Sequence, residues 1–169
     1  IVLSPSLALL AWFVYGFILW TAYISLTKSK ILPKYDLWGI GQYVRLWSMD
    51  RWHTAVGNLA IYTVLFLILC IAIGIILAIL LDQKIRAEGV LRTIYLYPMA
   101  LSFIVTGTAW KWVMNPTLGI EKFFIDIGFE NFTFDWLVTP GMSIYCIVIA
   151  GVWQSSGFIM AIFLAGLRS

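Results

Sequence analysis

Charge is scarce in this chain, and four long stretches lack it altogether. Asp, Glu, Lys and Arg make up 11% of the 169 residues, whereas a soluble domain averages about 25%. No Asp, Glu, Lys, Arg or His occurs in residues 1–27, 54–81, 93–110 or 136–167. A helix rising about 1.5 Å per residue needs about 20 apolar residues to cross a hydrocarbon core of about 30 Å. The scarcity therefore excludes a soluble domain and indicates several membrane spans.

Residues that carry chemistry are equally few. The chain has two cysteines and one histidine, His53. Cys70 and Cys146 form no CxxC pair, so neither a disulfide framework nor a zinc site is indicated. No phosphate-binding glycine loop, nucleophile elbow or HExxH motif occurs, and no basic face with aromatic spacing suits nucleic acid. We expect no catalytic residue, no metal site, no cofactor site and no nucleic-acid partner in this chain.

Four transmembrane helices are expected. They cover about residues 6–26, 55–81, 92–114 and 142–167. Asn115 ends the third because a residue before proline is pushed out of helical geometry, and Pro140-Gly141 is typical of a turn before the fourth. The predicted fold is an all-α integral membrane protein, a polytopic helical bundle that forms one domain over residues 1–169.

Charge alone leaves the orientation of this bundle open. With four spans, both chain ends and residues 82–91 share one side of the membrane, and residues 28–53 and 116–141 share the other. More Lys and Arg lie in the two long connections, which favours a cytoplasmic location for them. The density of basic residues, however, is higher around the short connection.

Neutral polar side chains take the place of charged ones within the spans. This excludes proton relays and voltage sensors, which need intramembrane charge. The neutral polar residues are Asn58, Thr63, Ser102, Thr106, Thr108, Gln154, Ser155 and Ser156. Each can bond between helices or line a watery path. Gln154 stands out because an unpaired amide is costly in lipid. Trp153 beside it can stack on a sugar or pack against a neighbouring helix.

Small residues recur four positions apart, which lets helix backbones approach closely. The pairs are Gly74/Ala78, Gly151/Ser155 and Ala161/Ala165. This spacing predicts a packed bundle. Gly107 and Gly157 are expected to add local flexibility to the third and fourth spans.

Residues 52–102, from WHTAVGNLAIYT to LYPMALS, resemble the second-to-third core-span region of sugar-type permease subunits of binding-protein-dependent ABC importers. The matching features are Asn58, Gly74, Ala78, Arg92 and Pro98. The segments DLWGIGQYVRLW and GTAWKWVMNPTLGI are also similar to the family, and VWQSSGFIMAIFLAGLRS resembles the helix before its coupling loop. The similarity covers nearly the whole chain and is to the maltose/glucose-type carbohydrate permease family, within which the segment YPMALSFIVTGTAWKW looks closest to permeases for glucose- or mannose-type uptake.

This resemblance implies a translocation subunit for carbohydrate that works by alternating access in the cytoplasmic membrane of a bacterium or archaeon. The implied partners are a second homologous permease, two cytoplasmic ATPases that hold ATP and Mg²⁺, and an extracytoplasmic sugar-binding protein. The family also places residues 82–91 in the cytoplasm, against the charge count, and implies a coupling loop after Ser169, so that the permease domain is incomplete here. The candidate pathway residues are Trp153, Gln154, Thr106, Trp110 and Asn58.

Two alternatives stay open. One is an importer for another small solute such as a glycerol phosphate, for which Lys111 is the nearby basic group. The other is a non-transport membrane scaffold. A secondary transporter would need an intramembrane carboxylate or a broken helix, and the sequence indicates neither.

Overall fold

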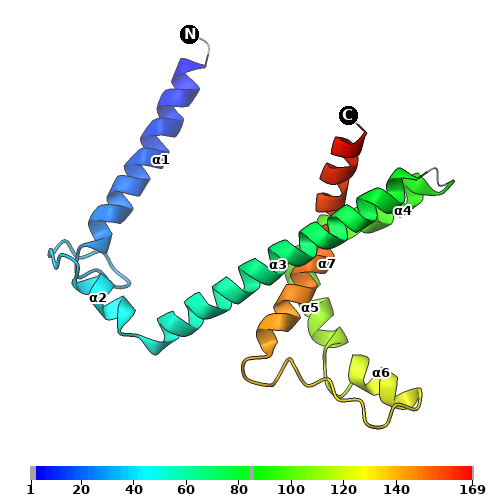
Figure 1. Ribbon diagram of the computed structural model, residues 1–169. Coiled ribbons are helices and arrows are strands. Elements are labelled where there is room, and N and C mark those ends of the chain that lie inside the picture. The colour runs from blue at the N-terminus through cyan, green and yellow to red at the C-terminus, as the bar shows by residue number, and fades with distance from the viewer. Residues whose placement is uncertain (1–2, 84–85, 169) are drawn as a thin grey trace. The chain divides into compact units, whose positions relative to one another are not determined.

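The computed structural model describes residues 3–83 and 86–168, and its regular structure is helical. The helices are α1 (Ser4–Ser25), α2 (Gly41–Trp47), α3 (Asp50–Asp82), α4 (Glu88–Leu96), the 3-10 helix η1 (Tyr97–Ala100), α5 (Phe103–Val113), α6 (Ile120–Asp126) and α7 (Ser143–Leu167) (Figure 1). The chain divides into two compact units, Ile1–Val56 and Gly57–Ser169. Residues 84–85 of the expected short connection lie outside the described residues.

The first unit consists of α1, a folded loop, α2 and the start of α3. No residue of α1 is buried within the described chain, as suits a helix surrounded by lipid. After α1, the loop is closed by an isolated antiparallel bridge between Thr27 and Leu37. The backbone nitrogen of Lys28 donates to the carbonyl oxygen of Asp36 at 2.9 Å. The loop is therefore tied at its base and leads directly into α2.

The second unit is built on the packing of α7 against α3, which cross in Figure 1. Two apolar clusters join these helices. One contains Cys70, Val148 and Val152, and the other contains Ala78, Leu81, Met160 and Leu164. Between them, a Cβ on Gly74 would lie 2.7 Å from Cγ2 of Ile159. The small residues of α3 thus bring the two backbones together, as their spacing predicts.

The order of these contacts shows that α3 and α7 run in the same direction. Cys70 in α3 meets the early part of α7, and Ala78 meets the later part. Two parallel helices that both span a membrane must be joined by a segment that crosses it an odd number of times. The α4–η1–α5 segment is the apolar stretch available for that return crossing.

This return segment corrects the expected continuous span over residues 92–114. Glu88–Ala100 and Phe103–Val113 are bent by 100° relative to each other. At Pro98, which has no N–H to bond the preceding turn, α4 passes into the 3-10 helix η1, and the break follows this 3-10 turn. Leu101 and Ser102 are extended, with ψ values of 144° and 149°. The three other expected spans correspond to α1, α3 and α7, so the predicted all-α membrane architecture is confirmed.

Gly157 marks the closest approach of α7 to the broken span. A Cβ at this position would collide with the backbone carbonyl of Tyr95 in α4. The sequence-based expectation that Gly157 adds flexibility is therefore wrong, because the missing side chain serves close packing. Gly107 in α5 differs, since a Cβ there would meet nothing within 4 Å.

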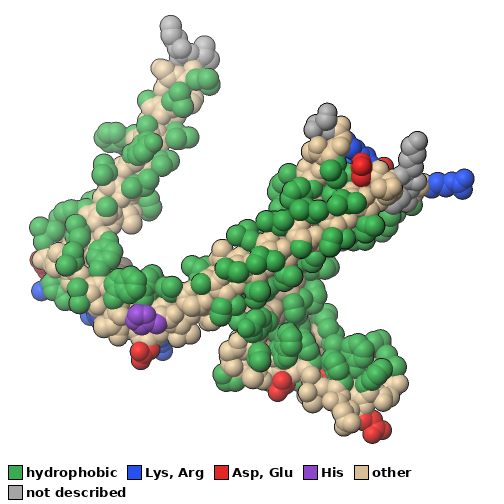
Figure 2. Space-filling view, viewed as in Figure 1, with side chains coloured by type: hydrophobic (Ala, Val, Ile, Leu, Met, Phe, Trp, Pro, Cys, Tyr) green, Lys and Arg blue, Asp and Glu red, His purple; other side chains and the backbone are tan. Residues whose placement is uncertain are grey.

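The surface of the described chain is mostly apolar. Figure 2 shows hydrophobic side chains along the helices, with charged side chains near the helix ends and loops. On α3, Leu67 and Ile68 are 51% and 59% exposed. Exposed aliphatic side chains on membrane-spanning helices face lipid or partner helices, where they carry no hydration cost.

The Gly157→Ala substitution is expected to destabilise the second unit. The added methyl group has to displace the backbone of α4, and overpacking of this kind costs about 1–3 kcal/mol. Gly107→Ala is the matched control, because it adds the same methyl group in open space and gains helix propensity. Unfolding by SDS in mixed micelles measures both. Equal stability of the two variants would contradict the close approach.

Candidate functional site

The break in the return span leaves backbone groups that need partners inside a membrane. Ser102 supplies one, because its hydroxyl accepts a hydrogen bond from the backbone nitrogen of Val105 at 3.3 Å and caps α5. The backbone nitrogen of Leu101 bonds the carbonyl oxygen of Pro98 at 3.2 Å. The carbonyl oxygen of Leu101 still requires a donor, since lipid offers none.

Gln154 of α7 supplies that donor. Its Nε2 donates to the carbonyl oxygen of Leu101 at 3.0 Å, and its side chain is buried. The bond ties the middle of α7 to the break in the return span. The amide thus has a structural partner on its nitrogen.

Trp153 lies next to Gln154 and meets Trp110 of α5. The two ring centroids are 5.7 Å apart with an interplanar angle of 73°, an edge-to-face pair. Trp153 is 41% exposed, so part of its indole is left uncovered by the described residues. Gln154, Trp153 and Trp110 therefore lie along the seam between α5 and α7, where an aromatic surface borders an amide.

Thr106 lies about one helical turn before Trp110 in α5 and is enclosed. Its side chain is 4% exposed, and its Oγ1 has no hydrogen-bond partner among the residues that the structure describes. No solute reaches this hydroxyl in the conformation seen here. Asn58 is exposed on α3, and no described contact joins its side chain to the other four candidates.

A small apolar hollow adjoins the seam. It has a volume of about 170 Å³. Its lining residues are Gly107, Trp110, Lys111, Met114, Leu137, Cys146, Ile147 and Ala150. This volume lies below the roughly 300–1,000 Å³ of typical ligand pockets. The hollow is an apolar flank of the seam and too small to enclose a sugar by itself.

A guanidinium cluster holds the other end of the second unit, and the sequence analysis missed it. Arg168 follows α7 and bonds three groups at the end of α3 and the start of α4. Its Nε donates to Oδ1 of Asp82 at 3.1 Å, its Nη1 to Oε1 of Glu88 at 2.6 Å, and its Nη2 to the carbonyl oxygen of Leu81 at 3.0 Å. We call this the Arg168 cluster. The only sign of it in the sequence is that Arg168 and the acidic residues Asp82 and Glu88 carry opposite charges near the ends of different helices.

Glu88 is the first residue of α4, at the charged end of the return segment, and the Arg168 cluster lowers the pKa of its carboxyl group. The main cause is the hydrogen bond from Arg168, with smaller contributions from the positive charges of Arg168 and Arg92. The ionised carboxylate is thus favoured at neutral pH.

Comparison with known proteins identifies the family of these helices. The chain is 40% identical over 169 residues to the "probable ABC transporter permease protein" of Pyrococcus horikoshii, covering 99% of this chain and 58% of that protein. The chain is homologous to ABC-importer permeases. The xylose/arabinose import permease protein of Haloferax volcanii is 36% identical over 92% of this chain and 50% of its own length. No family model matches the sequence.

Solved structures agree on the permease fold. A bacterial ABC transporter involved in the import of the acidic polysaccharide alginate aligns with a TM-score of 0.81 at 18% identity, covering 99% of this chain and 56% of that chain. A second structure, of the alginate transporter in complex with a pentasaccharide-bound periplasmic protein, aligns with a TM-score of 0.78. The chain spans about half the length of the curated permeases it matches.

Gln154→Leu is expected to loosen the break in the return span. The substitution keeps a similar volume but leaves the Leu101 carbonyl without a donor, which costs about 1–3 kcal/mol in a buried site. Hydrogen exchange of residues 97–105 is expected to speed up by at least tenfold. Thr108→Val is the control, since Thr108 bonds only within α5, to Ile104. Unchanged exchange in Gln154→Leu would show that the bond does not hold the break.

Acidification is expected to weaken the Arg168 cluster. Because the folded-state pKa of Glu88 is depressed, its stabilising contribution is complete above the unfolded pKa, near 4.5. It is lost as the pH falls through the lower folded value. Comparison of wild type and Glu88→Gln by thermal unfolding between pH 7 and pH 3 checks this. Wild type is expected to be more stable at pH 7, and the two curves are expected to converge at low pH. Parallel curves would contradict the role of this carboxylate.

Proposed function

We propose that this chain forms part of the translocation pathway of an ATP-driven importer for carbohydrates. The observation that carries the proposal is its 36% identity, over 92% of the chain, to a xylose/arabinose import permease protein. A trehalose/maltose permease protein of Thermococcus litoralis is 26% identical over the whole chain. The spans without charge suit an uncharged, hydroxyl-rich solute.

The partners belong to the same proposal. A second permease would complete the pathway, and an extracytoplasmic binding protein would deliver the sugar. Two cytoplasmic ATPases would bind ATP and Mg²⁺ and drive the change between inward-open and outward-open states. The location proposed for the assembly is the cytoplasmic membrane, with the Arg168 cluster at its cytoplasmic side.

The seam between α5 and α7 offers the sugar two kinds of contact. The exposed part of Trp153 presents an apolar aromatic face for the C–H side of a pyranose ring. The Gln154 amide lies beside it, and its oxygen remains to accept a hydroxyl proton, because the described bond uses only the nitrogen. Trp110 supports the indole of Trp153 from the edge. The exposed indole of Trp153 is the proposed solute contact in the state described here, and the buried Gln154 amide becomes a contact when α7 moves away from the break.

Thr106 and Asn58 have a different place in the proposed cycle. The Thr106 hydroxyl is buried and lacks a described partner, so it becomes available when α5 moves away from α7. Asn58 is exposed on α3 and would line the pathway after the second permease encloses it. Alternating access requires that each state satisfies a different set of such groups.

A phosphorylated solute is the second candidate. The sn-glycerol-3-phosphate transport system permease protein of Pectobacterium atrosepticum is 31% identical over 57% of this chain. Lys111 lines the hollow beside Trp110, which puts one positive charge next to the seam. A single lysine provides a point charge for phosphate.

Uptake by the reconstituted importer tests both candidates. Trp153→Ala and Gln154→Ala are each expected to reduce sugar uptake at least tenfold, since each removes a solute contact worth about 1.4 kcal/mol or more. Trp112→Ala is the control, because this exposed tryptophan of α5 lies outside the pair. Expression and assembly are verified by co-purification of the subunits.

The outcomes separate the candidates. Sugar uptake that stays at the wild-type level in both variants would remove the seam from the pathway. Uptake of a glycerol phosphate that depends on Lys111, with no uptake of neutral sugars, would favour the second candidate. No energised uptake of any solute would favour a scaffold.

A further inference from the structure

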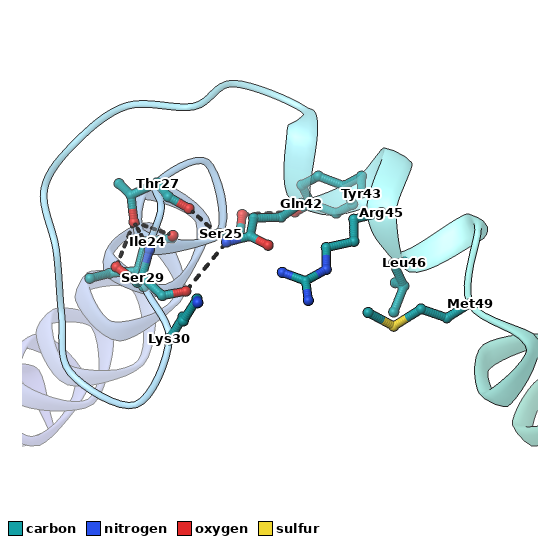
Figure 3. A pocket seen from close by; sticks show the side chains of 10 residues that line it. All are labelled: Ile24, Ser25, Thr27, Ser29, Lys30, Gln42, Tyr43, Arg45, Leu46 and Met49. Atoms are coloured by element: carbon teal, nitrogen blue, oxygen red, sulfur yellow. Dashed lines mark hydrogen bonds between the residues drawn. The ribbon is translucent and has the colours of Figure 1, made fainter.

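The loop after α1 and helix α2 enclose a hollow that the proposed transport function does not use. Its volume is about 440 Å³ (Figure 3). The lining residues are Ile24, Ser25, Thr27, Ser29, Lys30, Gln42, Tyr43, Arg45, Leu46 and Met49. All belong to the first unit. The hollow combines two cations, several hydroxyl groups and an apolar side.

Hydrogen bonds hold the polar side of this hollow in place. Gln42 of α2 donates through Nε2 to the carbonyl oxygens of Thr27 and Ser29, at 3.2 and 3.3 Å. The hydroxyls of Ser25 and Tyr43 are 2.7 Å apart. These bonds fasten the loop and the end of α1 to α2.

The two cations of the hollow are not neutralised. Lys30 comes from the loop and Arg45 from α2, and Figure 3 shows both side chains lining the hollow. Neither has an ion-pair partner among residues 3–83 and 86–168, and no acidic residue lines the hollow. Two uncompensated positive charges beside hydroxyl donors form a site for an oxyanion.

The position of the hollow selects the kind of anion. It lies at the end of α1, a 22-residue helix long and apolar enough to cross a membrane, so its expected depth is that of the lipid headgroups. Its other side is apolar, formed by Ile24, Leu46 and Met49. A free phosphate would use the cations only, whereas a phospholipid would also use the apolar side and the exposed surface of α1.

We propose that Lys30 and Arg45 bind the phosphate of an anionic phospholipid headgroup, with the hydroxyls of Ser25 and Tyr43 as further donors. The acyl chains lie along α1 and the apolar side of the hollow. Basic pockets between transmembrane helices bind anionic headgroups on the cytoplasmic side of membranes, and the same charge complementarity is proposed here for the opposite side. The bound lipid would fix the orientation of the loop relative to α1.

Lipid binding is measured by native mass spectrometry of the purified protein in about 0.5 M ammonium acetate, where the screening length is about 4 Å and diffuse attraction is small. The probes are phosphatidylglycerol and phosphatidylcholine with identical chains. Each cation near a membrane surface contributes about 1 kcal/mol, and tenfold in affinity corresponds to about 1.4 kcal/mol. Lys30→Ala/Arg45→Ala is therefore expected to weaken phosphatidylglycerol binding about thirtyfold. Lys28→Ala/Lys34→Ala is the matched control, because it also removes two positive charges, here both from the loop after α1, and neither residue lines the hollow.

A second variant guards against misfolding of the first. Leu46→Trp leaves both cations and fills the apolar side, so it is expected to weaken phosphatidylglycerol binding as well. Thermal unfolding confirms that each variant folds.

Three results would overturn the proposal. They are equal loss of binding in the two double alanine variants, no preference of the wild type for phosphatidylglycerol, and displacement of the lipid by inorganic phosphate at millimolar concentration. The last would assign the hollow to a free anion.

Discussion

A backbone group without a hydrogen-bond partner is the constraint on which the second unit depends, because lipid supplies neither donors nor acceptors. The return span is broken at Leu101 and Ser102, so other groups of the protein must bond the backbone there. The hydroxyl of Ser102 accepts from the backbone nitrogen of Val105 at the start of α5, and the Gln154 amide donates to the carbonyl oxygen of Leu101. The site where α7 meets the break therefore combines structural necessity with the polar groups that a solute pathway needs.

Packing of α3 against α7 helps to hold Gln154 close to the Leu101 carbonyl. Gly74 admits Ile159 of α7, and Gly157 admits the backbone of α4 at Tyr95. Two glycines on different helices thus place α7 between α3 and the broken span. The same arrangement makes α3 and α7 parallel, which requires the return segment to cross the membrane. The packing of α7 on α3 thus requires the return crossing, and the break in that crossing is bonded by the same helix α7.

Hydropathy was enough to predict the spans that became α1, α3 and α7, since each is long and uniformly apolar. It could not predict the bend after Pro98, because a proline is compatible with a kinked helix as well as with a full break. Trp153, Gln154, Trp110 and Thr106 were chosen by residue type, and the structure brings the first three to one seam. The candidate Asn58 stands apart, because a sequence does not show which face of α3 meets α7. Whether any of the five contacts solute stays a prediction.

The Arg168 cluster gives the end of the second unit a mechanical property. The planar guanidinium of Arg168 donates hydrogen bonds to Leu81 and Asp82 of α3 and to Glu88 of α4. Its rigid fork fixes the angles of these bonds as well as their lengths. The ends of α3, α4 and α7 are therefore joined through one side chain, and a rotation of α7 about its axis would strain all three hydrogen bonds at once.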